Sequence, residues 1–521
     1  MRRGLSLAIL LTCLPVTSRG EEQEQKHCRP GPGPQFTVSE ATTHITGPRT
    51  CDGLVDYATA LNDNARGGVS AEANAGLLFL QAFGPQPDGV PISDQFFDRL
   101  GIPTPEKEVA CFVSYEEYLH KVVGIPKDDE RSPRCLDELK GARTRPWASV
   151  KYPNVAGWLR FSRQPLLRIV QGTRRTAYFL PIDMSRREPG ASPALINALL
   201  PELRVSLSAA RALSARALLL ASEGRTAAAW NDLQATLRLG DLIGKGPTLV
   251  HGLAGIAVQS EAIDAAFPLI EASQPRAGLA RCWLRDVNRL PPPPEMIQKL
   301  TIAERYTLLD IVQRLATGAM AVNELKPDGD ERVVWRVLGV LALETVHWDT
   351  VMKTGNHRVD QIAEAMAIEN PQQRHSALAR LEQERMSLDR DIYQRFLKDS
   401  HLDALTAGEW LGHLLASAVL SNTAPQAAED RIIQLRRNLC LALALAAHHS
   451  EQGCYPEKLN DLVPRFIEQV QPDIFGGNAL HYQRTAVGYL LYSIGNNCRD
   501  DGGNSYDGES ESDDLCVRMG G

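Results

Sequence analysis

Three pairs of a carboxylate and an imidazole stand one helical turn apart and could take part in metal or acid-base chemistry. The pairs are Glu344 with His347, Glu117 with His120, and Glu409 with His413. The first is followed by Asp349 and resembles the ligand pairs of carboxylate-bridged metal centres in helical bundles, which need two such pairs plus further glutamates. Nothing in the sequence indicates that the pairs converge. Structural or surface histidines are therefore the favoured interpretation.

Other short catalytic motifs are incomplete or missing. Residues 240–246 are glycine-rich like a phosphate-binding loop, but the interval is one residue short, Gly246 stands where Ser or Thr binds magnesium, and no strand is predicted before it. We expect a helix C-terminus there, capped by Gly244 or Gly246. The sequence has no Gly-x-Ser-x-Gly, His-Glu-x-x-His or Cys-x-x-Cys, the commonest signatures of serine hydrolases, zinc proteases and zinc ribbons.

Charge is concentrated in residues 500–514. This segment holds seven carboxylates and no base, and the whole chain has a formal net charge of −7, so the remaining sequence is formally neutral. A neutral body without a basic stripe and interleaved aromatic residues argues against a nucleic-acid partner. With 43% hydrophobic and 23% charged residues, the 521-residue chain has a globular composition and a length typical of about two to four domains.

The N-terminus predicts a secretory signal peptide. Arg2 and Arg3 precede an apolar stretch over 5–14, and small residues over 16–20 provide a cleavage site before Arg19 or Glu21. The apolar stretch is shorter than the ~20 residues of a spanning helix, so no transmembrane anchor is expected after cleavage. Cys13 fits a lipoprotein site poorly. The expected location is outside the cytoplasm, in the periplasm, on the cell surface or secreted.

Cysteine usage agrees with an oxidising compartment. Removal of the signal with Cys13 leaves nine of the ten cysteines, so at least one thiol stays unpaired. Four lie in the N-terminal third and four in or beside the C-terminal module, with Cys282 between them, and the connectivity cannot be deduced from sequence. The nine cysteines are Cys28, Cys51, Cys111, Cys135, Cys282, Cys440, Cys454, Cys498 and Cys516.

Composition and turn signals divide the chain into five parts. These are a signal peptide over 1–20, a Glu-rich and Pro/Gly-rich linker over 21–50, an irregular mainly helical domain over 51–190, a helical domain over 191–431, and an α+β module over 432–521. In the irregular domain Ser70, Ser93 and Ser114 are predicted N-caps. Residues 158–170 are predicted as one helix and 176–180 as a strand.

The helical domain has the clearest periodicity. Apolar residues recur at three- and four-residue steps from Leu203 to Leu220, and a second helix follows Gly224 with Trp230, Leu233 and Leu237 on one face. The hairpin over 215–239 is similar to one tetratricopeptide-type unit, although no 34-residue repeat is found elsewhere. Helices are then expected over 295–420, after a break at Pro291–Pro294 and with another at Asn370 and Pro371, and over 432–447.

The C-terminal residues carry the most specific motifs. A helix leads into Tyr455 and Pro456, then an Asp473-Ile474-Phe475-Gly476 corner, Tyr482, and an acidic glycine-containing loop that begins at Asp500. In order and spacing this segment, about 434–518, resembles the globular C-terminal domain of the major pseudopilin of type II secretion systems, with Ile474 in place of the family's Pro. The resemblance implies a small α+β fold of a helix against a short sheet.

The same resemblance implies a calcium site in the acidic loop. Asp501, with Asp513 or Asp514, would supply carboxylates, and Asp500 is a possible substitute. A glycine-rich loop allows backbone carbonyls to complete the six to eight oxygens that calcium requires. The alternative interpretation is a solvated acidic tail without a bound ion.

The N-terminal part is similar to recurring elements of large exported bacterial proteins that end in such a module, a family with no assigned activity. The similarity rests on residues 52–57, 60–62, 74–75, 82–85, 158–159 and 165–166.

Together these features predict a mainly α protein with a helical body, a TPR-like hairpin and a pseudopilin-like module. The expected function is non-catalytic: an exported envelope protein that binds or organises protein partners, with a link to type II secretion. The alternative is an exported hydrolase, for which a deep pocket lined by Asp52, Asp56, Glu117 or His120 would argue. A secretion pseudopilus subunit would require a retained hydrophobic anchor.

Overall fold

The computed structural model describes residues 35–89, 91–104, 111–184, 194–198, 200–321, 346–399, 404–420, 424–505 and 512–520. The predicted signal peptide, residues 21–34 of the predicted linker and Glu344 lie outside these ranges. The described chain is mainly helical with one small sheet, which confirms the predicted fold class at that level.

Short helices make up the N-terminal part, as expected. They are α2 (Tyr57–Arg66), α3 (Ala75–Phe83), η2 (Pro87–Gly89), α4 (Asp94–Leu100), α5 (Tyr115–Tyr118), η3 (Leu119–Val123), α6 (Arg131–Ala142), α7 (Pro153–Phe161) and α8 (Arg163–Gly172). Ser93 and Ser114 are N-caps, each accepting a hydrogen bond from a backbone N–H three residues on. The prediction for Ser70 is wrong, because Asn74 caps α3. The helix predicted over 158–170 is two helices that meet at Ser162.

The predicted strand over 176–180 is not formed. The segment is extended, but its ladder contact is a single bridge from Ala177 to Asn74. Two buried asparagines take the place of a neighbouring strand. Asn74 Oδ1 accepts from the backbone N–H of Phe179 at 2.9 Å, and Asn62 Oδ1 accepts from that of Ile182 at 2.8 Å. Side-chain amides satisfy the backbone here, so β-rich composition did not lead to a sheet.

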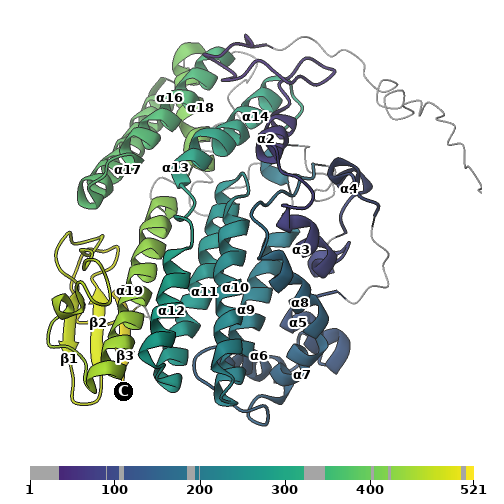
Figure 1. Cartoon of the computed structure of the whole chain (residues 1–521). Coiled ribbons are helices and arrows are strands. Elements are labelled where there is room, and N and C mark those ends of the chain that lie inside the picture. The colour runs from purple at the N-terminus through teal and green to yellow at the C-terminus, as the bar shows by residue number, and fades with distance from the viewer. Residues whose placement is uncertain are drawn as a thin grey trace, which may run out of the picture.

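Four long helices and one shorter helix form the centre of the molecule, side by side in Figure 1. They are α9 (Pro201–Ser222), α10 (Thr226–Gly244), α11 (Leu249–Ser273), α12 (Ala277–Asn288) and α19 (Ala424–Gln452), and the 3-10 turn η4 (Leu195–Asn197) precedes them. α9 and α10 form the predicted hairpin, joined by a turn at Gly224 (φ +73°). Stacking of Trp230 on Trp283 joins α10 to α12, with ring centroids 4.6 Å apart. α9 and α11 are long and apolar enough to span a membrane by length and composition, and both pack within this bundle.

The glycine-rich residues 240–246 are the end of α10, as expected, although Lys245 occupies the C-cap position. Their glycines permit close packing. A Cβ at Gly240 would lie 2.5 Å from the backbone oxygen of Gly255 on α11, and one at Gly244 would lie 2.7 Å from Pro294. Interhelical contact therefore explains why these positions lack side chains.

A second helical group lies beyond the end of the central bundle and carries the chain from α12 back to α19 (Figure 1). It consists of α13 (Met296–Lys299), η5 (Leu300–Glu304), α14 (Arg305–Ala316), α16 (Trp348–Met366), α17 (Pro371–Asp399) and α18 (Ala404–Val419). The breaks expected at Pro291–Pro294 and at Asn370 and Pro371 are present. Arg374 on α17 donates to both carboxylate oxygens of Asp430 at 2.7 and 2.6 Å, which joins this group to α19.

The C-terminal module is an antiparallel sheet against α19. Its elements are η8 (Leu459–Leu462), β1 (His481–Arg484), β2 (Tyr489–Ser493) and β3 (Leu515–Met519), with β2 in the middle. Two amides on α19 hold the module: Asn438 Nδ2 donates to Leu515 O at 3.0 Å, and Gln434 Oε1 accepts from Ile474 N at 3.0 Å. The helix predicted over 432–447 extends over 424–452.

The state of the cysteines can be given for the described residues. Cys51 is disulfide-bonded, which agrees with an oxidising compartment. The four cysteines of the C-terminal group are free thiols, namely Cys440, Cys454, Cys498 and Cys516.

Candidate functional site

The acidic loop between β2 and β3 brings three of the predicted metal ligands together. Asp501 Oδ2 accepts from Asp513 N at 3.2 Å and from Asn497 Nδ2 at 3.0 Å. Asp514 Oδ2 accepts from Asp501 N at 3.1 Å and Gly503 N at 2.7 Å. Burial raises the pKa of Asp514, and the neighbouring carboxylates of Asp501 and Asp500 add to the rise. The described parts of the loop, residues 496–505 and 512–514, are thus hydrogen-bonded around these carboxylates.

Two carboxylate oxygens in this loop have no hydrogen-bond partner among the described residues. Asp513 Oδ1 and Asp514 Oδ1 are both buried and unsatisfied, and Asp514 is only 1% exposed. A buried carboxylate oxygen without a donor is costly, and a hard cation would satisfy it. The residues present therefore suit calcium, although within the described part of the chain no group of three or more His, Cys, Asp or Glu is arranged to hold a metal ion.

Asp500 faces a different set of groups. Its Oδ1 accepts from Tyr492 OH at 3.1 Å and from Gly502 N at 2.9 Å, and its Oδ2 lies 3.7 Å from His481 Nδ1. The backbone N–H of Gly502 is the main cause that lowers its pKa. These contacts account for Asp500 without a bound ion.

The predicted carboxylate and imidazole pairs have local roles. Glu117 pairs with Lys121, and the ring of His120 is exposed. Glu409 is exposed, whereas burial lowers the pKa of His413, and Arg358 lowers it further. His347 Nδ1 lies 2.9 Å from Thr350 Oγ1 at the start of α16.

The residues proposed for a hydrolase do not form a site around a described pocket. Asp56 is the N-cap of α2 and accepts from Thr59 N at 2.9 Å, and Asp52 accepts from Thr50 Oγ1. Among the described residues, neither these carboxylates nor Glu117 and His120 line the two large grooves of the helical body or the small pocket beside Phe475.

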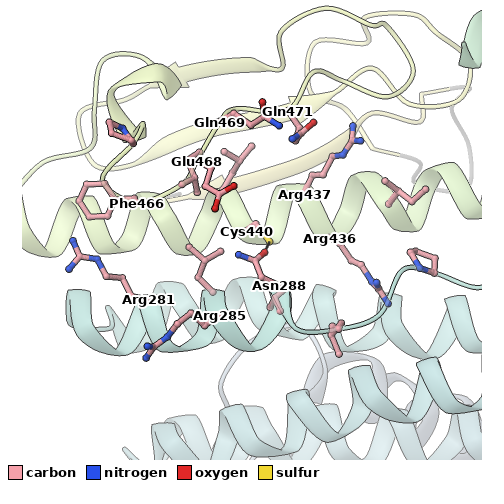
Figure 2. Close-up of a pocket in the computed structure, with 18 of the residues that line it drawn as sticks. Arg281, Arg285, Asn288, Arg436, Arg437, Cys440, Phe466, Glu468, Gln469 and Gln471 are labelled. Atoms are coloured by element: carbon pink, nitrogen blue, oxygen red, sulfur yellow. Dashed lines mark hydrogen bonds between the residues drawn. The ribbon is translucent and has the colours of Figure 1, made fainter. Parts of the chain in front are cut away.

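A groove of about 970 Å³ separates the helical body from the module (Figure 2). α12 and α19 form its floor and the segment over 464–471 forms its far wall. Most of its lining is apolar. The apolar side chains come from Leu284, Val287, Leu290, Pro293, Ile433, Leu441, Pro464, Phe466 and Ile467.

Two neighbouring arginines of α19 connect the elements around the groove by hydrogen bonds. Arg436 donates to Gln259 Oε1 on α11 at 2.6 and 3.0 Å and to Pro291 O at 2.6 Å. Arg437 donates to Pro472 O in the module at 2.9 Å. Burial lowers the pKa of both guanidinium groups, so each needs these oxygen partners.

A second network closes one end of the groove. Glu451 on α19 pairs with Arg281 on α12 at 2.8 Å and with Arg465 at 2.6 Å. Both guanidinium groups lie over the ring of Phe466, at 5.0 and 5.6 Å from its centroid. Cation–π contacts and ion pairs thereby fix the wall of the groove against the floor.

Several polar side chains of the groove remain exposed to solvent. Arg285 has no ion-pair partner among the described residues, and Glu468 and Gln469 are exposed on the opposite wall. An apolar channel with charged groups at its rim is suited to bind a protein segment. Burial raises the pKa of Cys440 to about 12, which favours the protonated thiol at neutral pH.

Sequence reasoning did not find this groove. Its residues come from α12, α19 and the 464–471 segment, which are far apart in the chain. Taken alone, each of these segments has the pattern of an ordinary core or surface element. The adjacent Arg436 and Arg437 inside an apolar helix were the available signal, since buried arginines need partners from other elements.

A scan against protein-family models finds no match, and searches of the curated proteins and the solved structures find none either.

Proposed function

We propose that this chain is an exported, non-catalytic protein that binds or organises a protein partner, and that the groove between α12, α19 and residues 464–471 is its binding site. The observation that carries the proposal is the groove itself: a largely apolar channel of about 970 Å³ with exposed charge at its rim. The partner segment would place apolar side chains on Leu284 and Leu441 and an acidic one near Arg285.

Export is supported by the signal-like N-terminal sequence and by the disulfide at Cys51. The intact mass of the protein recovered from the cell envelope or medium tests it. We expect a mature chain that begins at Arg19 or Glu21. A full-length cytoplasmic product would refute export.

Photocrosslinking tests the groove in the whole protein. A photoreactive benzoylphenylalanine replaces Gln469 inside the groove or, as the control, Val487, which is 73% exposed and outside it. We expect an adduct with a distinct protein from position 469 only. The purified partner should then bind at least tenfold more weakly to Arg285→Glu. Equal crosslinking from both positions, or unchanged affinity of the variant, would contradict the proposal.

We also propose that the C-terminal module is pseudopilin-like and links the protein to a type II secretion assembly or the cell surface. Its support is a long helix packed on a three-stranded antiparallel sheet. The corner residue Asp473 adds to this, because it is 2% exposed and accepts from Phe475 N, Ser493 Oγ and Ile494 N, each at 2.9 Å. The α9–α10 hairpin similarly supports a TPR-like unit in the body.

Calcium binding in the acidic loop is part of this proposal, with Asp501, Asp513 and Asp514 as ligands. Bound calcium would neutralise the clustered carboxylates. Because an ion that binds only the folded state adds about 2.7 kcal/mol at a hundredfold excess over Kd, we expect calcium to raise the melting temperature of the full chain. It should also slow hydrogen exchange over 496–505.

The Asp514→Asn variant distinguishes a loss of calcium binding from a loss of folding stability. The amide keeps an acceptor for Asp501 N and Gly503 N and removes the buried charge, so the variant should be at least as stable as wild type in chelator and lose the calcium response. Asp500→Asn is the matched control and should keep the response. Equal melting of wild type in calcium and chelator would leave an acidic loop without an ion.

A further inference from the structure

A second groove, of about 820 Å³, lies on another part of the helical body between α8 and α10, over α9. It is strongly cationic, with six arginines against two carboxylates, Glu223 and Asp232. The arginines are Arg160, Arg163, Arg174, Arg216, Arg225 and Arg238. No function described above uses them.

Most of this charge is uncompensated. Arg216 is held by both oxygens of Asp232 at 2.7 Å, and exposed Arg225 lies 3.4 Å from Glu223. The remaining four have no ion pair with a carboxylate in the described parts of the chain. Free guanidinium groups on opposite walls attract carboxylate or phosphate and can bind either in bidentate fashion.

Arginines lie at both ends of the groove. Lys245, just after α10, donates to Thr176 O, just after α8, at 3.0 Å, so the C-terminal ends of these helices lie together. Arg174 and Arg238 therefore mark one end, and Arg163 and Arg225 the other. At 1.5 Å per residue the two ends are about 16 Å apart along α8 and about 20 Å apart along α10.

Between the two ends, apolar side chains lie beside the ion pair of Arg216 with Asp232. Leu167 and Val170 of α8 face Leu219 and Leu220 of α9 and the alanines of α10, and Leu167 is 41% exposed. An inorganic or carbohydrate polyanion, polar along its whole length, would leave this floor without a partner. Single-stranded nucleic acid would need aromatic side chains for stacking, and none of the lining residues is aromatic.

A peptide can provide apolar side chains for the floor of the groove and carboxylates for the arginines at its ends. Asn231 and Gln234 lie beside the floor, and their side-chain amides could bond the free N–H and C=O groups of an extended backbone. A helical peptide has already satisfied those groups internally. An extended chain of about 3.3–3.6 Å per residue crosses 16–20 Å in roughly five or six residues.

We propose that the groove between α8 and α10 binds an extended acidic segment of a partner protein, in which two carboxylate side chains five or six positions apart flank apolar residues. Each carboxylate meets the arginines at one end, and the apolar residues cover Leu167, Val170 and Leu219.

Fluorescence anisotropy of the full chain with labelled synthetic peptides tests this spacing. The peptides carry two glutamates separated by two, five or eleven positions, with valine and alanine between them, at equal net charge. We expect the five-position peptide to bind at least tenfold more tightly than the two-position peptide, because only the longer one reaches both arginine clusters. Equal binding of all three would overturn the proposal, and so would tightest binding of the eleven-position peptide, which fits a helix.

Charge-reversal variants identify the surface. Arg163→Glu and Arg174→Glu remove one unpaired arginine from each end, and each should weaken the five-position peptide at least tenfold. Arg484→Glu makes the same change at an exposed position of β1, outside both grooves, and should leave the affinity unchanged. Arg163→Gln and Arg174→Gln, with melting temperatures alongside, keep the test valid if a reversed charge perturbs folding. Unchanged binding by the end variants, or equal competition by polyphosphate of matched length, would refute the site without affecting the proposed function of the α12–α19 groove.

Discussion

Lys299 shows how burial changes the chemistry of one side chain. It is 8% exposed at the end of α13 and donates to the backbone oxygen of Gly246. Burial lowers the pKa of this ammonium group to about 8, and the carboxylate of Glu304 only partly opposes the shift. The folded protein therefore releases a proton that the unfolded chain still holds between about pH 8 and 10.5.

Because the unfolded state binds more protons in that window, the contribution of Lys299 to stability rises with pH and is lowest below pH 8. Lys299→Met should be more stable than wild type at pH 7, and the difference should shrink by up to about 3 kcal/mol as the pH approaches 10.5. Urea unfolding of both proteins across this range measures it. A constant difference would mean that Lys299 titrates normally in the folded protein.

At the scale of elements, the crossing of α10 and α11 depends on glycines. Gly240 and Gly255 are each other's nearest neighbours, and a Cβ at Gly255 would lie 2.4 Å from Gly240 O. Backbone atoms cannot move aside as a flexible side chain can. The two helices are therefore held closer than any other residue type would permit.

Gly255→Ala should destabilise the protein by at least about 1–3 kcal/mol through this overpacking. Gly278→Ala is the matched control. Gly278 lies in α12 with no atom within 4 Å of a Cβ, and there the same change should be neutral or stabilising by about 0.5–1 kcal/mol. Denaturant midpoints of the two variants compare them. Similar midpoints would show that the crossing relaxes easily.

The sequence predicts elements where local signals decide them. Ser93 caps α4, the break at Pro371 separates α16 from α17, and Gly224 turns α9 into α10, because each acts within a few residues. The asparagines that hold residues 177–182 act across more than a hundred positions, and no local pattern reports them. The acidic loop could be predicted because its carboxylates are close in sequence, whereas both grooves depend on the packing of separate helices.

At the scale of the whole molecule, α19 belongs to the body and to the module. Arg436 bonds to α11 on one side, and Asn438, two positions on, bonds to β3 on the other. The boundary predicted at 431/432 falls within this helix. The amino-acid composition changes at this boundary, but the helix continues through it without a break.

The body and the module should therefore unfold together. Urea unfolding followed by tryptophan fluorescence should coincide with loss of hydrogen-exchange protection in β2, because the described tryptophans lie in the body and β2 lies in the module. Loss of protection in β2 at lower urea, with unchanged fluorescence, would show that the module is independent.

α19 also has a mechanical consequence. Its 29 residues make a strut of about 44 Å that has the sheet along one side and the bundle along the other. No slack chain separates the two, so tension on the module passes directly into the bundle through side chains such as Asn438 and Arg436. A pulling force applied to the sheet would therefore be distributed over the helical bundle as well as the module.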